Sequence, residues 1–291
     1  MQGFTRTIVL GGVARDVQAA TPTALITNME ATSAALRAGT SITADGTPHT
    51  KAATYTTLIA STAVAAYGMW VLLGDSNNTG QERAVLVDIA KGAAVSEINL
   101  INNINGGEAT LWAAAATATC GKLFYFPGLT IPLGTRISAR SQASTGSQTT
   151  NVGIWLDTRI QFQVGNSAYV TYGADTATSR GTSVPSGANA LGAWTNIGTT
   201  SASHNLWVIG LDALGDTSLA SEQFFIEVGY GPNAGSITTM VSGLICSTDA
   251  TERIASAIPP FFGFVLTSGN LVWVRMASNG GETRGVILYG V

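Results

Sequence analysis

Apolar residues recur at every second position in several short segments of the chain. Residues 84–90 place Val85, Val87 and Ile89 on one side and Leu86 and Asp88 on the other. Such a period of two is typical of a strand with one buried face. Gly-, Asn- and Ser-rich turns separate these segments. Further strands are predicted at residues 69–73, 135–141, 206–211, 222–230, 271–276 and 286–291. Helix signals are weak, and residues 28–38 before Gly39 are the candidate for a short helix.

The chain also resembles itself. Blocks of similar sequence recur in the same order at a nearly constant separation. The paired blocks begin at Gly39 and Gly181, Tyr67 and His204, Leu86 and Phe225, Gly134 and Gly269, and Val152 and Val286. In this matching Trp70 corresponds to Trp207, and Trp155 corresponds to Tyr289. A tandem duplication explains the pattern, with each copy close to the commonest domain size.

About seven or eight short strands per copy are typical of a β-sandwich. The sequence has no immunoglobulin-like Cys…Trp…Cys pattern, so a jelly roll is the preferred topology. We therefore predict an all-β protein with two tandem antiparallel, jelly-roll-like β-sandwiches. Residues 1–38 form an N-terminal arm, 39–156 the first copy, 157–180 a linker strand and 181–291 the second copy. Residues 159–164 alternate and should pair with a sheet edge.

The amino-acid composition indicates which classes of molecule this chain is suited to bind. Charged residues make up only 11% of the chain, and the net charge is −3. An acidic chain without basic runs does not favour nucleic acid. The most apolar window, residues 59–74, is short and interrupted, so no membrane span is expected, and residues 2–14 do not have the form of a signal peptide. A surface of Thr, Ser, Asn, Gly and Ala instead favours packing against copies of the chain or other proteins.

Catalytic and metal-binding motifs are incomplete. Gly74-Asp75-Ser76 resembles the nucleophile block of SGNH hydrolases, but that family needs Asp-x-x-His, and His204 follows Ser201 at that spacing. A turn explains Asp75 and Ser76 equally well. We expect no enzyme, and a Ser76-dependent hydrolase is the remote alternative.

No cofactor or metal is expected either. Cys120 and Cys246 have no metal-site spacing and are interpreted as buried thiols. His49 and His204 are isolated, and the Asp75–Thr79 loop lacks the distant Glu of a calcium site.

Charged and aromatic residues that match between the copies indicate a binding or structural role. Arg140 matches Arg275, and each is expected to bridge to an acid, Asp88 or Glu227, on a neighbouring strand or subunit. The matched aromatic residues are interpreted as core. The alternative is a carbohydrate- or receptor-binding module with an exposed aromatic shelf, for instance Trp112 or Trp194. The interface candidates are Arg140, Arg275, Arg159, Phe4 and Ile8.

Residues 126–145, which run from Phe126-Pro-Gly-Leu to Ser-Thr145, are followed by the strand 152–156. This layout resembles blocks of small β-sandwich proteins in tailed-bacteriophage structural modules. The second copy keeps the strand, Arg275 and the turn, but has Thr267-Ser-Gly269 in place of Pro132-Leu-Gly134. The resemblance implies a virion protein: head decoration or cement, or a tail, collar or fibre-base component. Its partners would be copies of itself, for example in a trimer, and other virion proteins. If the chain is instead a carbohydrate- or receptor-binding module, a host surface glycan would be a partner.

Overall fold

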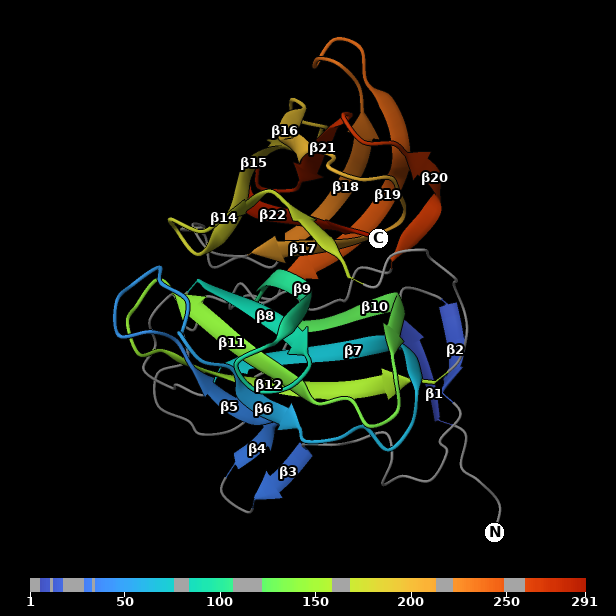
Figure 1. Ribbon diagram of the computed structural model, residues 1–291. Helices are drawn as coiled ribbons and strands as arrows, with labels where there is room; N and C mark the ends of the chain where they lie inside the picture. The colour runs from blue at the N-terminus through green and yellow to red at the C-terminus, as the bar shows by residue number, and fades with distance from the viewer. Residues whose placement is uncertain are drawn as a thin grey trace.

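The computed structural model describes residues 6–10, 13–17, 29–32, 35–75, 84–106, 122–158, 168–212, 222–248 and 260–291, with side chains from residue 39 onward. Every helix or strand within these ranges is a β-strand, so the protein is all-β as the alternation predicts (Figure 1). None of the described residues forms a helix that could cross a membrane.

Eight strands form the first sandwich. They are β5 (Thr40–Thr43), β6 (Thr56–Ile59), β7 (Ala66–Asp75), β8 (Val85–Lys91), β9 (Ile98–Asn105), β10 (Lys122–Ile131), β11 (Ile137–Ala143) and β12 (Thr149–Asp157). One sheet has the order β10-β7-β12-β5 and the other has the order β6-β11-β8-β9. Counted along the chain, these orders are sixth-third-eighth-first and second-seventh-fourth-fifth, which is a jelly roll.

Eight further strands repeat this topology. They are β15 (Arg180–Ala188), β16 (Thr195–Thr199), β17 (His204–Asp212), β18 (Glu222–Tyr230), β19 (Thr238–Thr248), β20 (Phe261–Leu266), β21 (Leu271–Ser278) and β22 (Thr283–Gly290). The orders β20-β17-β22-β15 and β16-β21-β18-β19 are those of the first sandwich. A short parallel pairing between the end of β15 and β21 joins the two sheets at one corner, and the other pairings are antiparallel. The second sandwich is therefore a second jelly roll.

Short strands precede each sandwich. β1 (Arg6–Leu10) pairs with β2 (Val13–Val17), and β3 (Met29–Thr32) pairs with β4 (Ala35–Ala38). The helix expected at residues 28–38 is therefore wrong, since residues 29–32 and 35–38 form two paired antiparallel strands; Thr32, like Ser, has a low helix propensity. In the linker, β13 (Val170–Tyr172) pairs with β22 and β14 (Ala174–Asp175) pairs with β15. The alternating segment 159–164 lies outside the described residues.

The pairing of strands in the structure changes the alignment of the two copies at Trp70 and Trp207, which the sequence alone matches to each other. Trp155 of β12 lies opposite Trp70, whereas its counterpart Tyr289 lies opposite Val208. Trp70 therefore corresponds to Val208, and Trp207 to Met69. A shift of one residue moves a side chain to the other face of the sheet. Trp207 accordingly lies in the second core, while Trp70 stacks on Tyr125 on the opposite face of its own sheet.

A further repeated block appears in β10 and β20. Phe126-Pro-Gly-Leu-Thr-Ile131 occupies the same place as Phe261-Phe-Gly-Phe-Val-Leu266, because Phe126 pairs with Met69 and Phe261 pairs with Trp207. Gly128 and Gly263, the third residue of each block, have φ values of 79° and 104°, which favour glycine. The pairing of both strands is irregular here, which is typical of a β-bulge.

Two strands of the second sandwich contribute to both apolar cores. Trp207, Ile209 and Leu211 of β17 point into the second sandwich. The alternate residues Leu206 and Val208 belong to the core of the first sandwich. The end of β22 behaves in the same way: Val286 and Leu288 belong to the second core, and Ile287, Tyr289 and Val291 belong to the first. β17 and the end of β22 are therefore buried on both faces, and the second sandwich packs on β9 and β10 of the first (Figure 1).

Candidate interaction surfaces

The junction between the sandwiches is closed by Tyr289. Its hydroxyl accepts the N–H of Asn105 at 2.9 Å and donates to the carbonyl of Asn103 at 3.0 Å. Its ring lies edge-on to Phe124 and Phe126, with centroids 6.4 and 5.4 Å away. Burial raises the pKa of Tyr289, so the buried group is a neutral phenol. The backbone of the β9 edge is thus hydrogen-bonded by the second sandwich instead of by water.

Lys122 adds a charged contact at the same junction. Its ammonium group donates to the carbonyl of Leu211 at 2.8 Å and to Oδ1 of Asn105 at 3.3 Å. The side chain of Lys122 starts on β10 and reaches β17, so it ties the first sandwich to the second. Asn105 is fully buried and hydrogen-bonded to both Tyr289 and Lys122. The second sandwich thus bonds the backbone N–H of Asn105 through Tyr289, and Lys122 of the first sandwich bonds its side-chain Oδ1.

The linker closes the middle of the same edge. Tyr169 donates its N–H to the carbonyl of Leu100 in β9 at 2.7 Å and its hydroxyl to the carbonyl of Pro127 in β10. The ring of Tyr169 also meets Phe126 edge-on at 5.1 Å. One side chain and one amide thus bridge the two sheets of the first sandwich.

Arg140 and Arg275 bind the acids that the repeat suggests. Nε of Arg140 lies 3.0 Å from Oδ2 of Asp88, and the two residues face each other on β11 and β8. Arg275 lies 2.6 Å from Glu227, its direct neighbour between β21 and β18. The prediction that each arginine bridges to an acid on a neighbouring strand is confirmed. Use of the same residues at an interface with another molecule stays a prediction.

The surroundings of the two acids differ. Asp88 is fully buried and also accepts Lys51 Nζ at 2.6 Å and the N–H of Asn103 at 3.0 Å. Glu227 is bonded by Ser242 at 2.7 Å. Burial raises the pKa of Glu227, but the bonds from Ser242 and Arg275 outweigh it and leave the pKa below its ordinary value. Glu227 is therefore held as a charged acceptor, and Asp88 accepts hydrogen bonds from two basic side chains and one backbone amide.

Each arginine also stacks on an aromatic ring that sequence reasoning missed. The guanidinium of Arg140 lies 4.6 Å from the ring centre of Tyr55, and that of Arg275 lies 4.5 Å from the ring centre of Trp194. Both rings immediately precede the second strand of their sandwich and are followed by Thr, a signal that aligning the copies could have revealed. The stacking holds each guanidinium over the ring and favours a fixed side-chain geometry.

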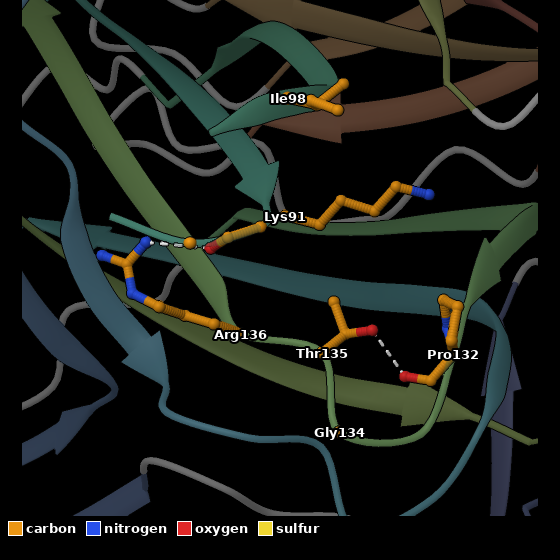
Figure 2. Close-up of a pocket in the computed structure, with 8 residues that line it drawn as sticks. Lys91, Ile98, Pro132, Gly134, Thr135 and Arg136 are labelled. Carbon is orange, nitrogen blue, oxygen red and sulfur yellow. Dashed lines mark hydrogen bonds between the residues drawn. The ribbon is translucent and has the colours of Figure 1, made fainter. Parts of the chain in front are cut away.

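A shallow hollow lies at one end of the first sandwich (Figure 2). Its volume is about 480 Å³, and Lys91, Ile98, Thr135 and Arg136 are among its lining residues. Its polar groups bond to one another and to backbone: Thr135 donates to the carbonyl of Pro132 at 2.6 Å, Lys91 to that of Thr130 at 3.1 Å, and Arg136 to Glu97 at 2.9 Å. The bond from Arg136 lowers the pKa of Glu97. This arrangement is typical of a structured protein surface.

A second hollow of about 760 Å³ lies where the first sandwich meets the linker and β15. It is lined by His49, Ser144, Ala174, Asp175, Thr178, Arg180, Gly181, Thr182 and Ser183. Nδ1 of His49 is 3.0 Å from the hydroxyl of Ser179, so this histidine links the first sandwich to the linker.

The remaining predicted residues divide into two groups. Arg159, Phe4, Ser76, Trp112 and Cys120 lie outside the described residues, and Ile8 lies in β1, whose side chains are not among those described. Of the others, Cys246 is buried and its pKa rises to about 12, as expected for an inert thiol, and His204 is buried against the hydroxyl of Tyr172 at 2.6 Å. Across the described ranges, His, Cys, Asp and Glu form no group of three or more that could hold a metal ion.

Comparison of the chain with protein-family models gives no match, and comparison with curated proteins gives none either.

Proposed function

We propose that this chain is a non-enzymatic structural protein of a bacteriophage virion. It would lie on the particle exterior, as a head decoration or cement protein or as a tail, collar or fibre-base component. Its work would be done by interface burial and by assembly with copies of itself and with other virion proteins.

The apolar junction between the two jelly rolls is the observation that carries the proposal. Leu206, Val208 and Ile287 of the second sandwich complete the core of the first, and Tyr289 and Lys122 bond across the junction. Such a junction makes the two sandwiches one stiff body, which suits a protein that must present fixed surfaces to neighbours. The low charge of the chain agrees, since extensive contact surfaces are poor in charge.

The virion assignment itself draws on the resemblance of residues 126–145. That segment forms the bulged strand β10, the turn after it and the strand β11 that carries Arg140. The same structural unit recurs as β20 and β21 with Arg275. The resembling segment is therefore a repeated structural unit, and Arg140 and Arg275 hold it to β8 and β18.

The proposal is tested on particles purified from a lysate whose phage genome encodes this chain. Peptide mass spectrometry should find the chain in a fixed ratio to the major capsid or tail protein, and cryo-electron microscopy should show two stacked sandwiches on the exterior. Absence of the chain from purified particles would refute the proposal.

A glycan-binding module is the competing function, because Trp194 and Trp273 are only partly buried near Arg275. It predicts saturable glycan binding that Trp194→Ala abolishes and that Trp70→Phe leaves intact. Glycan binding by a chain that is absent from particles would favour this second function.

A further inference from the structure

Exposed apolar residues gather along one edge of the second sandwich. Phe262, Phe264 and Val265 on β20 are 57%, 40% and 73% exposed, and Ile245 on β19 is 64% exposed. β19 and β20 are the last described strands of their sheets in the strand order, and thus the counterparts of β9 and β10. We call this surface the β19/β20 edge.

The same positions in the first sandwich are buried. Ile245 lies opposite Phe225, and its counterpart Asn105 lies opposite Leu86. Asn105 and Leu86 are fully buried, whereas Phe225 is 37% exposed. In the repeated block of β10 and β20, Leu129 is the counterpart of Phe264 and is 1% exposed. The second sandwich thus exposes apolar side chains at positions that the first sandwich covers.

The cover in the first sandwich is known. It consists of the outer face of β17 and β22 together with Tyr169 of the linker, that is, the next sandwich along the chain and the segment that precedes it. Across the described residues, no sandwich lies on the β19/β20 edge in the same way. Large exposed apolar patches of this kind usually mark interaction sites.

We propose that the β19/β20 edge binds a second copy of this chain, head to tail. The first sandwich of the second copy would dock as the second sandwich docks on β9 and β10. This inference rests on the self-assembly in the proposed function and names the surface that performs it. The occupant follows from the repeat: the β9/β10 edge accepts the outer face of a sandwich of the same fold, and the β19/β20 edge is made of the counterpart strands.

The surface offered by the second copy is the part of the outer face of β7 and β12 around Trp155 and Leu72. On the same face Trp70 is stacked on Tyr125 and only 7% exposed, and β4 contacts both strands, so the contact involves only the exposed part of this face. Trp155 stands there in the position of Tyr289, the residue that closes the junction within the chain, and Trp155 is partly exposed. Leu72 stands in the position of Gly210 and is also partly exposed. Two different surfaces meet in such a contact, so repeated docking yields a ring if the rotation closes and a filament if it does not.

Val265→Asp tests the edge in the full-length chain, because a side chain that is 73% exposed can change without loss of fold. Val95→Asp is the matched control, since Val95 is 98% exposed in the first sandwich. Sedimentation velocity over a range of concentrations should show assembly of the wild-type chain and of Val95→Asp. The dissociation constant of Val265→Asp should rise at least about tenfold, because a carboxylate would enter an apolar contact.

The direction of docking is tested with the wild-type chain alone. Hydroxyl-radical footprinting at low and high concentration should protect both Phe264 and Trp155 on assembly. Protection of Phe264 without Trp155 would indicate two-fold contact between β19/β20 edges and overturn the head-to-tail arrangement.

The other outcomes are equally decisive. A wild-type chain that stays monomeric at every concentration overturns the inference, and so does equal assembly of Val265→Asp and wild type. Assembly through this edge by a chain that is absent from virions would overturn the proposed function and leave the docking surface standing.

Discussion

The β9/β10 edge of the first sandwich and the β19/β20 edge of the second have the same strands and register but opposite surroundings. At one position, the first sandwich has the fully buried Asn105 and the second has Ile245, which is 64% exposed. The polar residue is buried and the apolar residue is exposed, contrary to the usual preference. The burial of Asn105 has a local basis: Tyr289 accepts its backbone N–H and Lys122 donates to its side-chain Oδ1.

This comparison shows that a fold alone does not decide which edge is covered. Duplication gives both sandwiches the same edge, and the sequence then adapts each edge to what lies on it. Directional hydrogen bonds suit the junction within the chain, because its two sides belong to one chain and stay in contact. Exposed apolar side chains suit a contact that forms between separate molecules, because apolar burial is less directional.

Asp88 and its counterpart Glu227 are expected to show the largest difference in the stability cost of equivalent substitutions in the two sandwiches. Asp88→Ala should lower the free energy of unfolding by about 3–5 kcal/mol, because it leaves Lys51 and Arg140 without their shared buried carboxylate. Glu227→Ala removes bonds from Arg275 and Ser242 at a less enclosed position and should cost about 1–3 kcal/mol. Urea denaturation of both variants measures the two values.

Asp88→Asn is the matched variant, since it keeps the size of the side chain and removes the charge. It should recover part of the loss, because Asn still accepts the N–H of Asn103. Equal costs for Asp88→Ala and Glu227→Ala would contradict the deeper burial of the first acid.

The next largest difference concerns the repeated bulge. Leu129→Ala should cost about 2–5 kcal/mol, because Leu129 is 1% exposed and its loss leaves a cavity in the core of the first sandwich. Phe264→Ala changes the equivalent residue, which is 40% exposed, and should cost less than about 1 kcal/mol in dilute solution. Thermal unfolding at low protein concentration measures both, before self-association can stabilise the folded state.

A large cost for Phe264→Ala in the monomer would show that the β19/β20 edge is part of the core instead of a docking surface. A small cost for Leu129→Ala would show that the second sandwich and the linker do not hold the first edge closed.

Much of the fold follows from the sequence. Alternation of apolar residues predicts β8, β18 and β21. β21 buries one of its faces as the alternation indicates, whereas β8 is buried on both faces because Asp88 is enclosed by Lys51 and Arg140 and Leu86 lies in the core. The repeat predicts the pairing of Arg140 with Asp88 and of Arg275 with Glu227, because cross-strand partners duplicate together. Two copies of the same strand pattern also predict two sandwiches of the same topology, which the strand orders show.

The sequence does not predict the junction, for a physical reason. β17 is buried on both faces, so its residues form a nearly continuous apolar run without alternation. Aligning the two apolar runs on their tryptophans then matches Trp70 with Trp207. In the structure the two side chains lie on opposite faces of equivalent sheets, so this alignment is off by one residue. The register, and with it the role of Tyr289, depends on strand pairing that only the three-dimensional structure supplies. Ile8, Phe4 and Arg159 stay predictions as interface residues.

The smallest effect tests the junction most directly. Tyr289→Phe removes one hydroxyl and keeps the ring between Phe124 and Phe126, so it leaves the N–H of Asn105 and the carbonyl of Asn103 without their shared partner. Two buried backbone groups that lose a hydrogen bond should cost about 1–3 kcal/mol. Tyr55→Phe is the control, because its hydroxyl bonds Asn99 at a partly exposed position and should cost less. Hydrogen exchange then locates the loss: the amide of Asn105 should exchange faster in Tyr289→Phe while amides in the centre of β18 keep their protection. Uniform acceleration in both sandwiches would mean that the junction and the two cores unfold as one cooperative unit, and unchanged exchange at Asn105 would mean that the hydroxyl does not hold the β9 edge.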